Sequence, residues 1–131
     1  MKYLVDADWL IDAMVGRARA QETLAHISDE GVAVSIIAVA EVYEGAFNTS
    51  DPQATLEGMR EFLGDFSVLP VTDPIVERFA RTRAMLRRHG QMITDMDLLI
   101  ASTALDANLT LITRNLRHFT RIPDLQIYLR P

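Results

Sequence analysis

The sequence contains no cysteine among its 131 residues, which excludes disulfide bonds, thiolate metal sites and a cysteine nucleophile. Only 6 glycines and 5 prolines occur, too few for a collagen-like or low-complexity chain. The longest apolar run, from Val32 to Ala40, is interrupted by Ser35 and falls short of the ~18 residues that a membrane helix needs. A first apolar run, residues 3–5, stops at Asp6 and is too short for a signal peptide. These absences predict a cytoplasmic protein that is not in a membrane.

Lysine is almost absent as well, since Lys2 is the only lysine among 13 basic residues and the others are arginines. The 18 acidic residues give a net charge of -5, which argues against a sequence-independent nucleic-acid binder. Arginine suits bidentate contacts with phosphate, but it equally suits exposed helix faces and ion pairs. For the two arginine clusters we favour an ordinary solvated helix face. They contain Arg78, Arg81, Arg83, Arg87 and Arg88, and then Arg114, Arg117 and Arg121.

What is present predicts a folded α/β chain with residues 1–131 as one domain. Hydrophobic residues make up 49% of the chain and charged residues 24%. Short β-branched or apolar runs predict strands at residues 2–5, 32–34, 68–71, 109–112 and 126–129, separated by segments with helical periodicity. One or two helices between strands indicate right-handed crossovers. We therefore expect a central, mostly parallel sheet of four to five strands covered by helices on both faces.

Acidic and amide side chains recur at the points where these strands end or the next helices begin. In a parallel sheet such points lie near one edge, where ligands bind. Carboxylates that face one another without a cation repel, and their pKa values rise. Oxygen-rich clusters of this kind are typical of Mg²⁺ or Mn²⁺ sites. The residues expected at this edge are Asp6, Glu41, Asp95, Asp97, Arg114 and Asn115.

Each of these residues also has a purely structural interpretation. Asp6 can cap the turn after its strand, and Asp8 is better explained as the N-cap of a short helix than as a ligand. Glu41 lies in an apolar stretch, so it either faces outward or is held by a partner. Thr94 with Asp97 matches a capping box. The three histidines have no metal-ligand spacing, and surface roles are expected for them: His26, His89 and His118.

Four segments together resemble the PIN-domain family. They are residues 3–12 with Asp6, 35–41 from a helix-capping serine to Glu41, 97–105 from Asp97, and 111–115 followed by Phe119. The third and fourth segments resemble most the VapC toxins of toxin–antitoxin pairs. The resemblance implies a compact α/β/α sandwich and a Mg²⁺-dependent endoribonuclease, with Mn²⁺ as an alternative ion. By motif match, Asp6, Glu41 and Asp97 would be the catalytic metal ligands.

The sequence departs from the family pattern at two positions. Ala7 and Asp8 stand where the family often has threonine and asparagine, so Asp8 becomes an additional candidate ligand. Asn115 stands where many members have an acid, and Asp95 is a candidate for supplying part of that charge. The resemblance further implies an RNA substrate, a VapB-like antitoxin and a homodimer. Arg114 and Arg117 are candidates for holding the RNA backbone.

The apolar residues of segment 56–66 form a wider stripe than one-sided packing needs. Phe62, with Phe47 or Tyr43, is therefore a candidate patch for binding the antitoxin or a second copy.

Two alternatives remain open. The first is a phosphatase of the haloacid dehalogenase type, because Asp6-Ala7-Asp8 after a strand resembles its nucleophile motif. That chemistry normally recruits a lysine, and Lys2 is at the wrong end of the strand. The second alternative is a PIN fold without activity that serves as a binding module. The intact Asp6, Glu41 and Asp97 argue against it.

Overall fold

The computed structural model describes residues 1–129 and has a four-stranded parallel sheet at its centre. The strands are β1 (Tyr3–Val5), β2 (Val32–Ser35), β3 (Ser67–Leu69) and β4 (Thr110–Ile112), in the order β3-β2-β1-β4. Leu4 pairs with Ala33 on one side and with Leu111 on the other, so β1 and β2 occupy the middle of the sheet. The predicted α/β class and the parallel sheet of at least four strands are confirmed.

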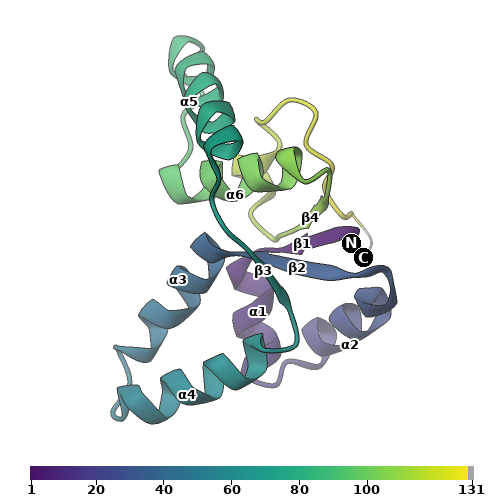
Figure 1. Ribbon diagram of the computed structural model, residues 1–131, viewed down its shortest axis with the longest axis vertical. Coiled ribbons are helices and arrows are strands. Elements are labelled where there is room, and N and C mark those ends of the chain that lie inside the picture. Colours follow the sequence, from purple (N-terminus) through teal and green to yellow (C-terminus); the bar gives the residue numbers. More distant parts are fainter. Residues whose placement is uncertain (130–131) are drawn as a thin grey trace.

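Helices cover both faces of this sheet. In Figure 1, α1 to α4 lie on one side of the sheet, and α5 and α6 lie on the other. Their bounds are α1 Ala7–Met14, α2 Ala18–Ile27, α3 Ile36–Ala46, α4 Pro52–Leu63, α5 Asp73–Arg88, α6 Asp95–Asp106 and α7 Leu116–Phe119, with a 3₁₀ turn η1 at Ser28–Glu30. No helix within residues 1–129 is long and apolar enough to cross a membrane.

Local capping explains where most helices begin. Ser35 accepts a hydrogen bond from the Ile37 backbone N–H at 3.0 Å, and Asp51 accepts one from Ala54 at 3.2 Å. One predicted cap is wrong by two residues, because Asp6 and not Asp8 is the N-cap of α1.

The predicted fifth strand, residues 126–129, is wrong in extent. Only Ile127 forms a bridge, with Leu111 of β4. The Leu111 N–H donates to Gln126 O, and the Tyr128 N–H donates to Leu111 O, both at 2.8 Å. A single residue of β4, Leu111, therefore meets the returning chain with both of its backbone groups.

Helices α5 and α6 pack together but differ sharply in burial. Helix α6 has seven buried residues among its twelve, whereas α5 has two buried residues, Ile75 and Leu86, among sixteen. The buried face of α6 fills the space between α5 and the sheet, and this position brings its first turn to the carboxyl edge of β1. The location of Asp97 follows from this packing.

Candidate active site

Asp6 is the last residue before α1 and lies at the carboxyl end of β1. Its Oδ1 accepts the Ala7 backbone N–H at 2.8 Å, and its Oδ2 accepts the Thr113 hydroxyl at 2.7 Å. Burial raises the pKa of Asp6 to about 6, and the charge of Asp8 adds to the rise. The side chain is thus both the predicted structural cap and a buried acid with an altered titration.

Asp97 lies in the first turn of α6 and is buried. Its backbone N–H donates to Thr94 Oγ1 at 3.3 Å, which is one half of the predicted capping box. Its carboxylate instead accepts hydrogen bonds from the segment after β4. Asn115 Nδ2 lies 2.9 Å and His118 Nδ1 lies 2.8 Å from Asp97 Oδ2. His118 Nδ1 also lies 2.9 Å from Asn115 Nδ2, which can only donate, so His118 donates to Asp97 in the tautomer with its hydrogen on Nδ1 and accepts from Asn115 in the other.

Glu41 is half-buried in the middle of α3, the helix that Ser35 caps. Its Oε1 is buried and has no hydrogen-bond partner among the described residues. Burial raises the pKa of Glu41 to about 7, and the charges of Asp6, Asp97 and Asp8 raise it further. The sequence predicted that Glu41 either faces outward or is held by a partner. Neither prediction is fully met, because the side chain is half-buried and its Oε1 has no hydrogen-bond partner among the described residues.

Asp8 joins the same group from the first turn of α1. Its Oδ1 accepts the Trp9 backbone N–H at 2.7 Å, and its Oδ2 accepts the Arg114 backbone N–H at 2.9 Å. Burial raises the pKa of Asp8, and the hydrogen bond from Arg114 opposes the rise. We call these four side chains the carboxylate cluster: Asp6, Asp8, Glu41 and Asp97.

The remaining sequence candidates differ in their position relative to the carboxylate cluster. Asp95 is exposed and accepts a hydrogen bond from Arg83 Nε of α5 at 2.9 Å. Its charge is therefore already balanced by a cation on the neighbouring helix. Arg117 is exposed on α7. Arg114 lies beside the cluster through its backbone, while its guanidinium points to the ring of Trp9.

Two residues of the site were not anticipated. Thr113 orients Asp6 and also accepts the Asn115 backbone N–H at 3.0 Å. The expected surface role is wrong for His118, because its ring reaches Asp97. The spacing offered a clue, since His118 is three residues after Asn115 and a short helix there places both on one side.

The donor set suits a hard divalent cation in composition. It consists of carboxylate oxygens, which Mg²⁺ and Mn²⁺ prefer, and one of them is a buried oxygen without a partner. Burial, and after it the charges of the neighbouring carboxylates, raise the pKa values of Asp6 and Glu41, and a bound cation would oppose both effects. Within residues 1–129, however, no three Asp, Glu or His side chains are gathered closely enough to enclose an ion. Metal binding by Asp6, Glu41 and Asp97 stays a prediction.

The phosphatase alternative lacks the lysine that it needs. Lys2 Nζ forms an ion pair with Glu30 Oε1 at 3.1 Å, at the amino end of β1. The carboxylate cluster lies at the opposite end of that strand. The single lysine of the chain therefore cannot assist a phosphoryl transfer there.

Comparison with known proteins identifies the family of the chain. The profile of the PIN domain matches residues 3–125. Ribonuclease VapC2 of Haemophilus influenzae is 30% identical over 128 residues, which cover 96% of each chain. Ribonuclease VapC1 of Methanocaldococcus jannaschii is 33% identical over 129 residues, covering 97% of this chain and 87% of the relative.

Solved structures show the same fold. VapBC2 from Rickettsia felis, bound to a promoter DNA fragment, superimposes with a TM-score of 0.90 at 25% identity and 98% coverage of both chains. VapBC-1 from nontypeable Haemophilus influenzae gives a TM-score of 0.86 at 28% identity, covering 98% of this chain and 97% of the other. The chain therefore belongs to the PIN domain family and is similar along its length to the family's VapC ribonucleases.

Proposed function

We propose that this protein is a metal-dependent endoribonuclease and the toxin of a VapBC-type toxin–antitoxin pair. The observation that carries the proposal is the unpartnered, buried Oε1 of Glu41 within a cluster of mutually repelling carboxylates. Such an arrangement costs free energy unless a cation joins it. The relatives similar to this chain are named ribonucleases, which supports RNA cleavage as the reaction that the cation would assist.

Asp6, Glu41 and Asp97 would hold Mg²⁺, with Asp8 and Asn115 beside them. When bound, the ion would stabilise charge on the phosphate and lower the pKa of an attacking water. The protein's own part is to orient the acids. Thr113 holds Oδ2 of Asp6 and the Ala7 N–H holds its Oδ1, while Asn115 and His118 contact Oδ2 of Asp97. No side-chain nucleophile is needed for this chemistry.

Cleavage of bulk RNA tests the activity. We expect cleavage in Mg²⁺ or Mn²⁺, none in EDTA, and none for the double variant Asp6→Asn, Asp97→Asn in either. Asp29→Asn, an exposed acid of η1 at the other end of the strands, is the matched control and should cleave normally. If the folded wild type binds a VapB-like antitoxin but leaves RNA intact with every ion, the inactive binding module is the correct alternative.

For the antitoxin we propose a groove between α1 and α4. The groove has a volume of about 500 Å³, and the lining is mainly apolar, with Ile11, Val15, Met59 and Phe62. Structures similar to this chain are VapBC complexes, which supports an antitoxin as its occupant. We expect Tyr43 to contribute less than Phe62, because the Arg60 guanidinium already lies 5.5 Å from the centre of the Tyr43 ring. An antitoxin arginine that reaches the carboxylate cluster from this groove would block the cation.

Phe62→Glu should therefore weaken antitoxin binding while the isolated chain stays folded, because Phe62 is only partly buried. Isothermal titration with the antitoxin measures this, and Tyr43→Glu should have the smaller effect. Unchanged affinity in both variants would place the antitoxin elsewhere.

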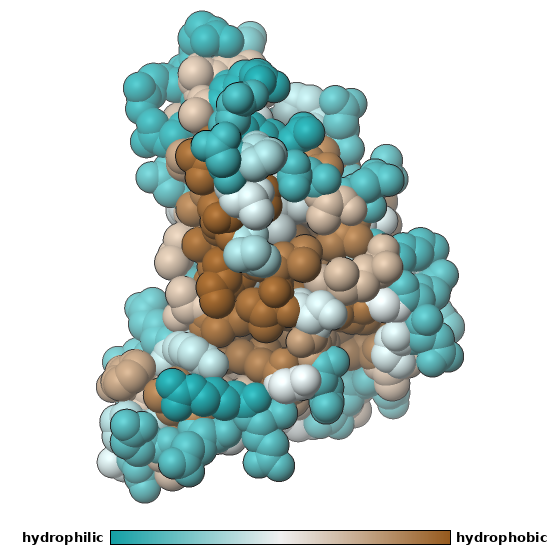
Figure 2. Space-filling model, viewed as in Figure 1, coloured by the Kyte–Doolittle hydropathy of each residue, from teal (hydrophilic) through white to brown (hydrophobic). Residues whose placement is uncertain are grey.

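For the homodimer we propose a different surface, the apolar band formed by Ile36, Val68, Val76 and Met96. All four are at least 41% exposed. Figure 2 shows hydrophobic surface, drawn in brown, between α5 and α3 on the face where Figure 1 draws the edge strand β3. Apolar surface beside an open strand edge favours association with a second copy. Val68→Glu should shift sedimentation toward the monomer, and an unchanged dimer would contradict this assignment.

A further inference from the structure

A second polar hollow lies beside the carboxylate cluster, where α1 ends, α2 begins and the chain leaves β4. Its volume is about 840 Å³. Its walls carry three arginines, one aspartate and one tryptophan, and the small side chains of Ala18 and Ala20 leave it open. We call it the arginine hollow, and its polar lining is Trp9, Asp12, Arg17, Arg19 and Arg114.

One carboxylate organises two of the three guanidinium groups. Asp12, whose side chain is 14% exposed, forms ion pairs with Arg17 Nε at 3.3 Å and with Arg114 Nη1. The Arg114 guanidinium also lies 4.7 Å from the centre of the Trp9 ring, a cation–π arrangement. Arg114 is thus held in one orientation before any ligand arrives, which lowers the entropy cost of binding.

The charge of the hollow is opposite to that of the whole chain. Three guanidiniums against one carboxylate leave two positive charges in a protein whose net charge is -5. The hollow also adjoins the acidic site, because the Arg114 backbone N–H donates to Asp8 Oδ2. Planar guanidiniums beside an aromatic ring suit the phosphates of a single-stranded nucleic acid.

We propose that the arginine hollow binds the phosphate backbone of single-stranded RNA next to the bond that the carboxylate cluster cleaves. This proposal rests on the proposed ribonuclease function. Arg17, Arg19 and Arg114 contact phosphate, while Asp12 and Trp9 act as positioning residues for Arg114. Arg17 and Arg19 belong to this binding site although they lie nearly one hundred residues before Arg114 in the sequence.

Binding is measured without cleavage in the Asp97→Asn background, using a fluorescent single-stranded oligoribonucleotide of mixed sequence. Arg17→Ala with Arg19→Ala should weaken binding about tenfold or more at about 0.1 M salt. The slope of log K against log salt should become shallower by about 0.7 for each phosphate that the variant no longer neutralises. Both side chains are exposed, so circular dichroism should show an unchanged fold.

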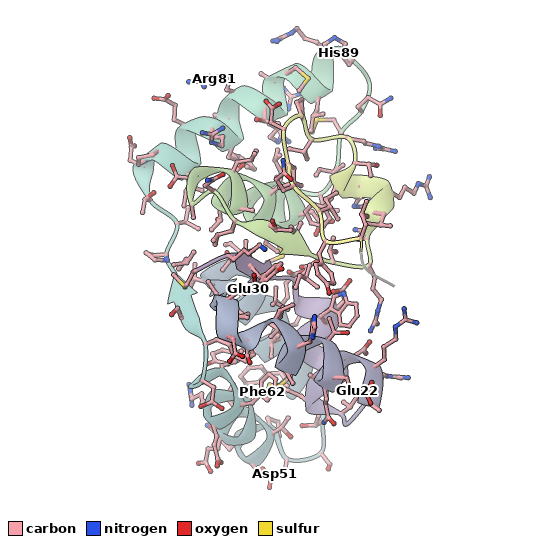
Figure 3. All side chains as sticks on the ribbon, turned by 90° about the vertical axis from the view of Figure 1, so that its right-hand side faces the viewer. Glu22, Glu30, Asp51, Phe62, Arg81 and His89 are labelled. Atoms are coloured by element: carbon pink, nitrogen blue, oxygen red, sulfur yellow. The ribbon has the colours of Figure 1, made fainter. Side chains whose placement is uncertain are left out.

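The matched control is Arg87→Ala with Arg88→Ala, two exposed arginines near the end of α5. Figure 3 shows that His89, which follows them, lies at one end of the molecule, far from Glu22 of α2. This control should keep the wild-type affinity and salt slope. In the active protein, the Arg17, Arg19 variant should raise KM for RNA about tenfold and leave kcat unchanged, as loss of uniform binding requires.

The outcomes separate this proposal from the proposed function. If the protein cleaves RNA and the Arg17, Arg19 variant keeps the wild-type KM and salt slope, the hollow does not bind RNA. The proposed ribonuclease function would be unaffected. RNA binding that depends on the two arginines, without cleavage, would support the hollow and reject the ribonuclease. If the Arg17, Arg19 variant lost affinity for the antitoxin but bound RNA as the wild type does, the proposal would be overturned. The hollow would then bind an acidic segment of a protein and not RNA.

Discussion

Helix α1 carries two aspartates one turn apart that lie in opposite electrostatic settings. Asp12 is paired with two guanidinium groups. It is the only carboxylate among the described residues that line the arginine hollow. Asp8 faces Asp6 and contributes to the raised pKa of both Asp6 and Glu41. The same residue type, four positions apart, therefore stabilises one region and destabilises the other.

The difference shows where this fold balances charge and where it does not. A carboxylate that is paired with a guanidinium orients both side chains at little cost in stability. Buried carboxylates without a cation lower the stability of the fold until a proton or a cation binds them. Crowded acids of one sign are what a cation-dependent site requires before its ion arrives. Four predictions test this contrast, from the largest expected effect to the smallest.

The largest effect is expected at His118, which orients Asp97. His118→Ala should lower RNA cleavage about 10- to 100-fold, because partners of a metal-binding carboxylate typically contribute that much. His118→Asn should recover part of the loss, since its amide N–H can replace Nδ1–H toward Asp97. Steady-state kinetics measures this effect. A lower kcat with an unchanged KM for RNA in His118→Ala would show that His118 orients Asp97 and does not bind RNA. Equal activity of His118→Ala and wild type would remove His118 from the site.

The next effect is pH-dependent stability of the metal-free protein. The pKa of Glu41 is raised from 4.5 to about 7 in the folded state, so its ionised form is disfavoured by folding. The stability of the wild type should fall as pH rises from about 5 to 8. Glu41→Gln should remove part of this fall, about 1 kcal/mol at pH 8 after solvent screening. Urea denaturation in EDTA at several pH values measures it, and parallel pH profiles would contradict it.

The same acid-to-amide change should have the opposite sign in the arginine hollow. Asp12→Asn weakens the ion pairs with Arg17 and Arg114, which are largely exposed. We expect the free energy of unfolding to fall by about 0.5 kcal/mol at pH 8. Chemical denaturation of Asp12→Asn and Glu41→Gln under the same conditions provides the matched comparison, because both variants replace an acid by its amide. A stability gain for Asp12→Asn would remove the contrast between the two regions.

The smallest effect is expected at Asp95, which pairs with Arg83 on the surface. Asp95→Asn should change stability by less than about 0.5 kcal/mol, as exposed pairs generally do. Cleavage should stay within about twofold of wild type, because Asp95 lies outside the carboxylate cluster. A reduction as large as that of His118→Ala would restore Asp95 as a supplier of charge for the ion.

Sequence patterns predicted best where the deciding interaction is local. Ser35 and Thr94 cap helices through bonds to residues two or three positions away, so their role follows from the adjacent sequence. The carboxyl-edge rule also placed Asp6, Glu41 and Asp97 in one region, because parallel strands bring their ends together. The cap of α1 was assigned to Asp8 instead of Asp6 because both have the residue type that caps prefer.

Interactions across long separations were not visible in the sequence. Thr113 reaches Asp6 across 107 positions, and His118 reaches Asp97 across 21. Nothing in the local pattern around Arg17 indicates that it shares an aspartate with Arg114. The extent of the last strand was missed for the same reason, since the bridge between Ile127 and Leu111 joins residues 16 positions apart.

The sequence by itself determined the alternation of strands and helices, the acids at the strand ends and the excess of arginine over lysine. These features depend on residue type and on spacing within a few turns. The tertiary structure alone decided which acids remain unpaired and which become half of an ion pair. Burial of α6 against the sheet brings Asp97 to Asp6, and the turn between α1 and α2 brings Arg17 to Asp12. Charge has its effect through distance and solvent, and both are defined only once the chain has folded.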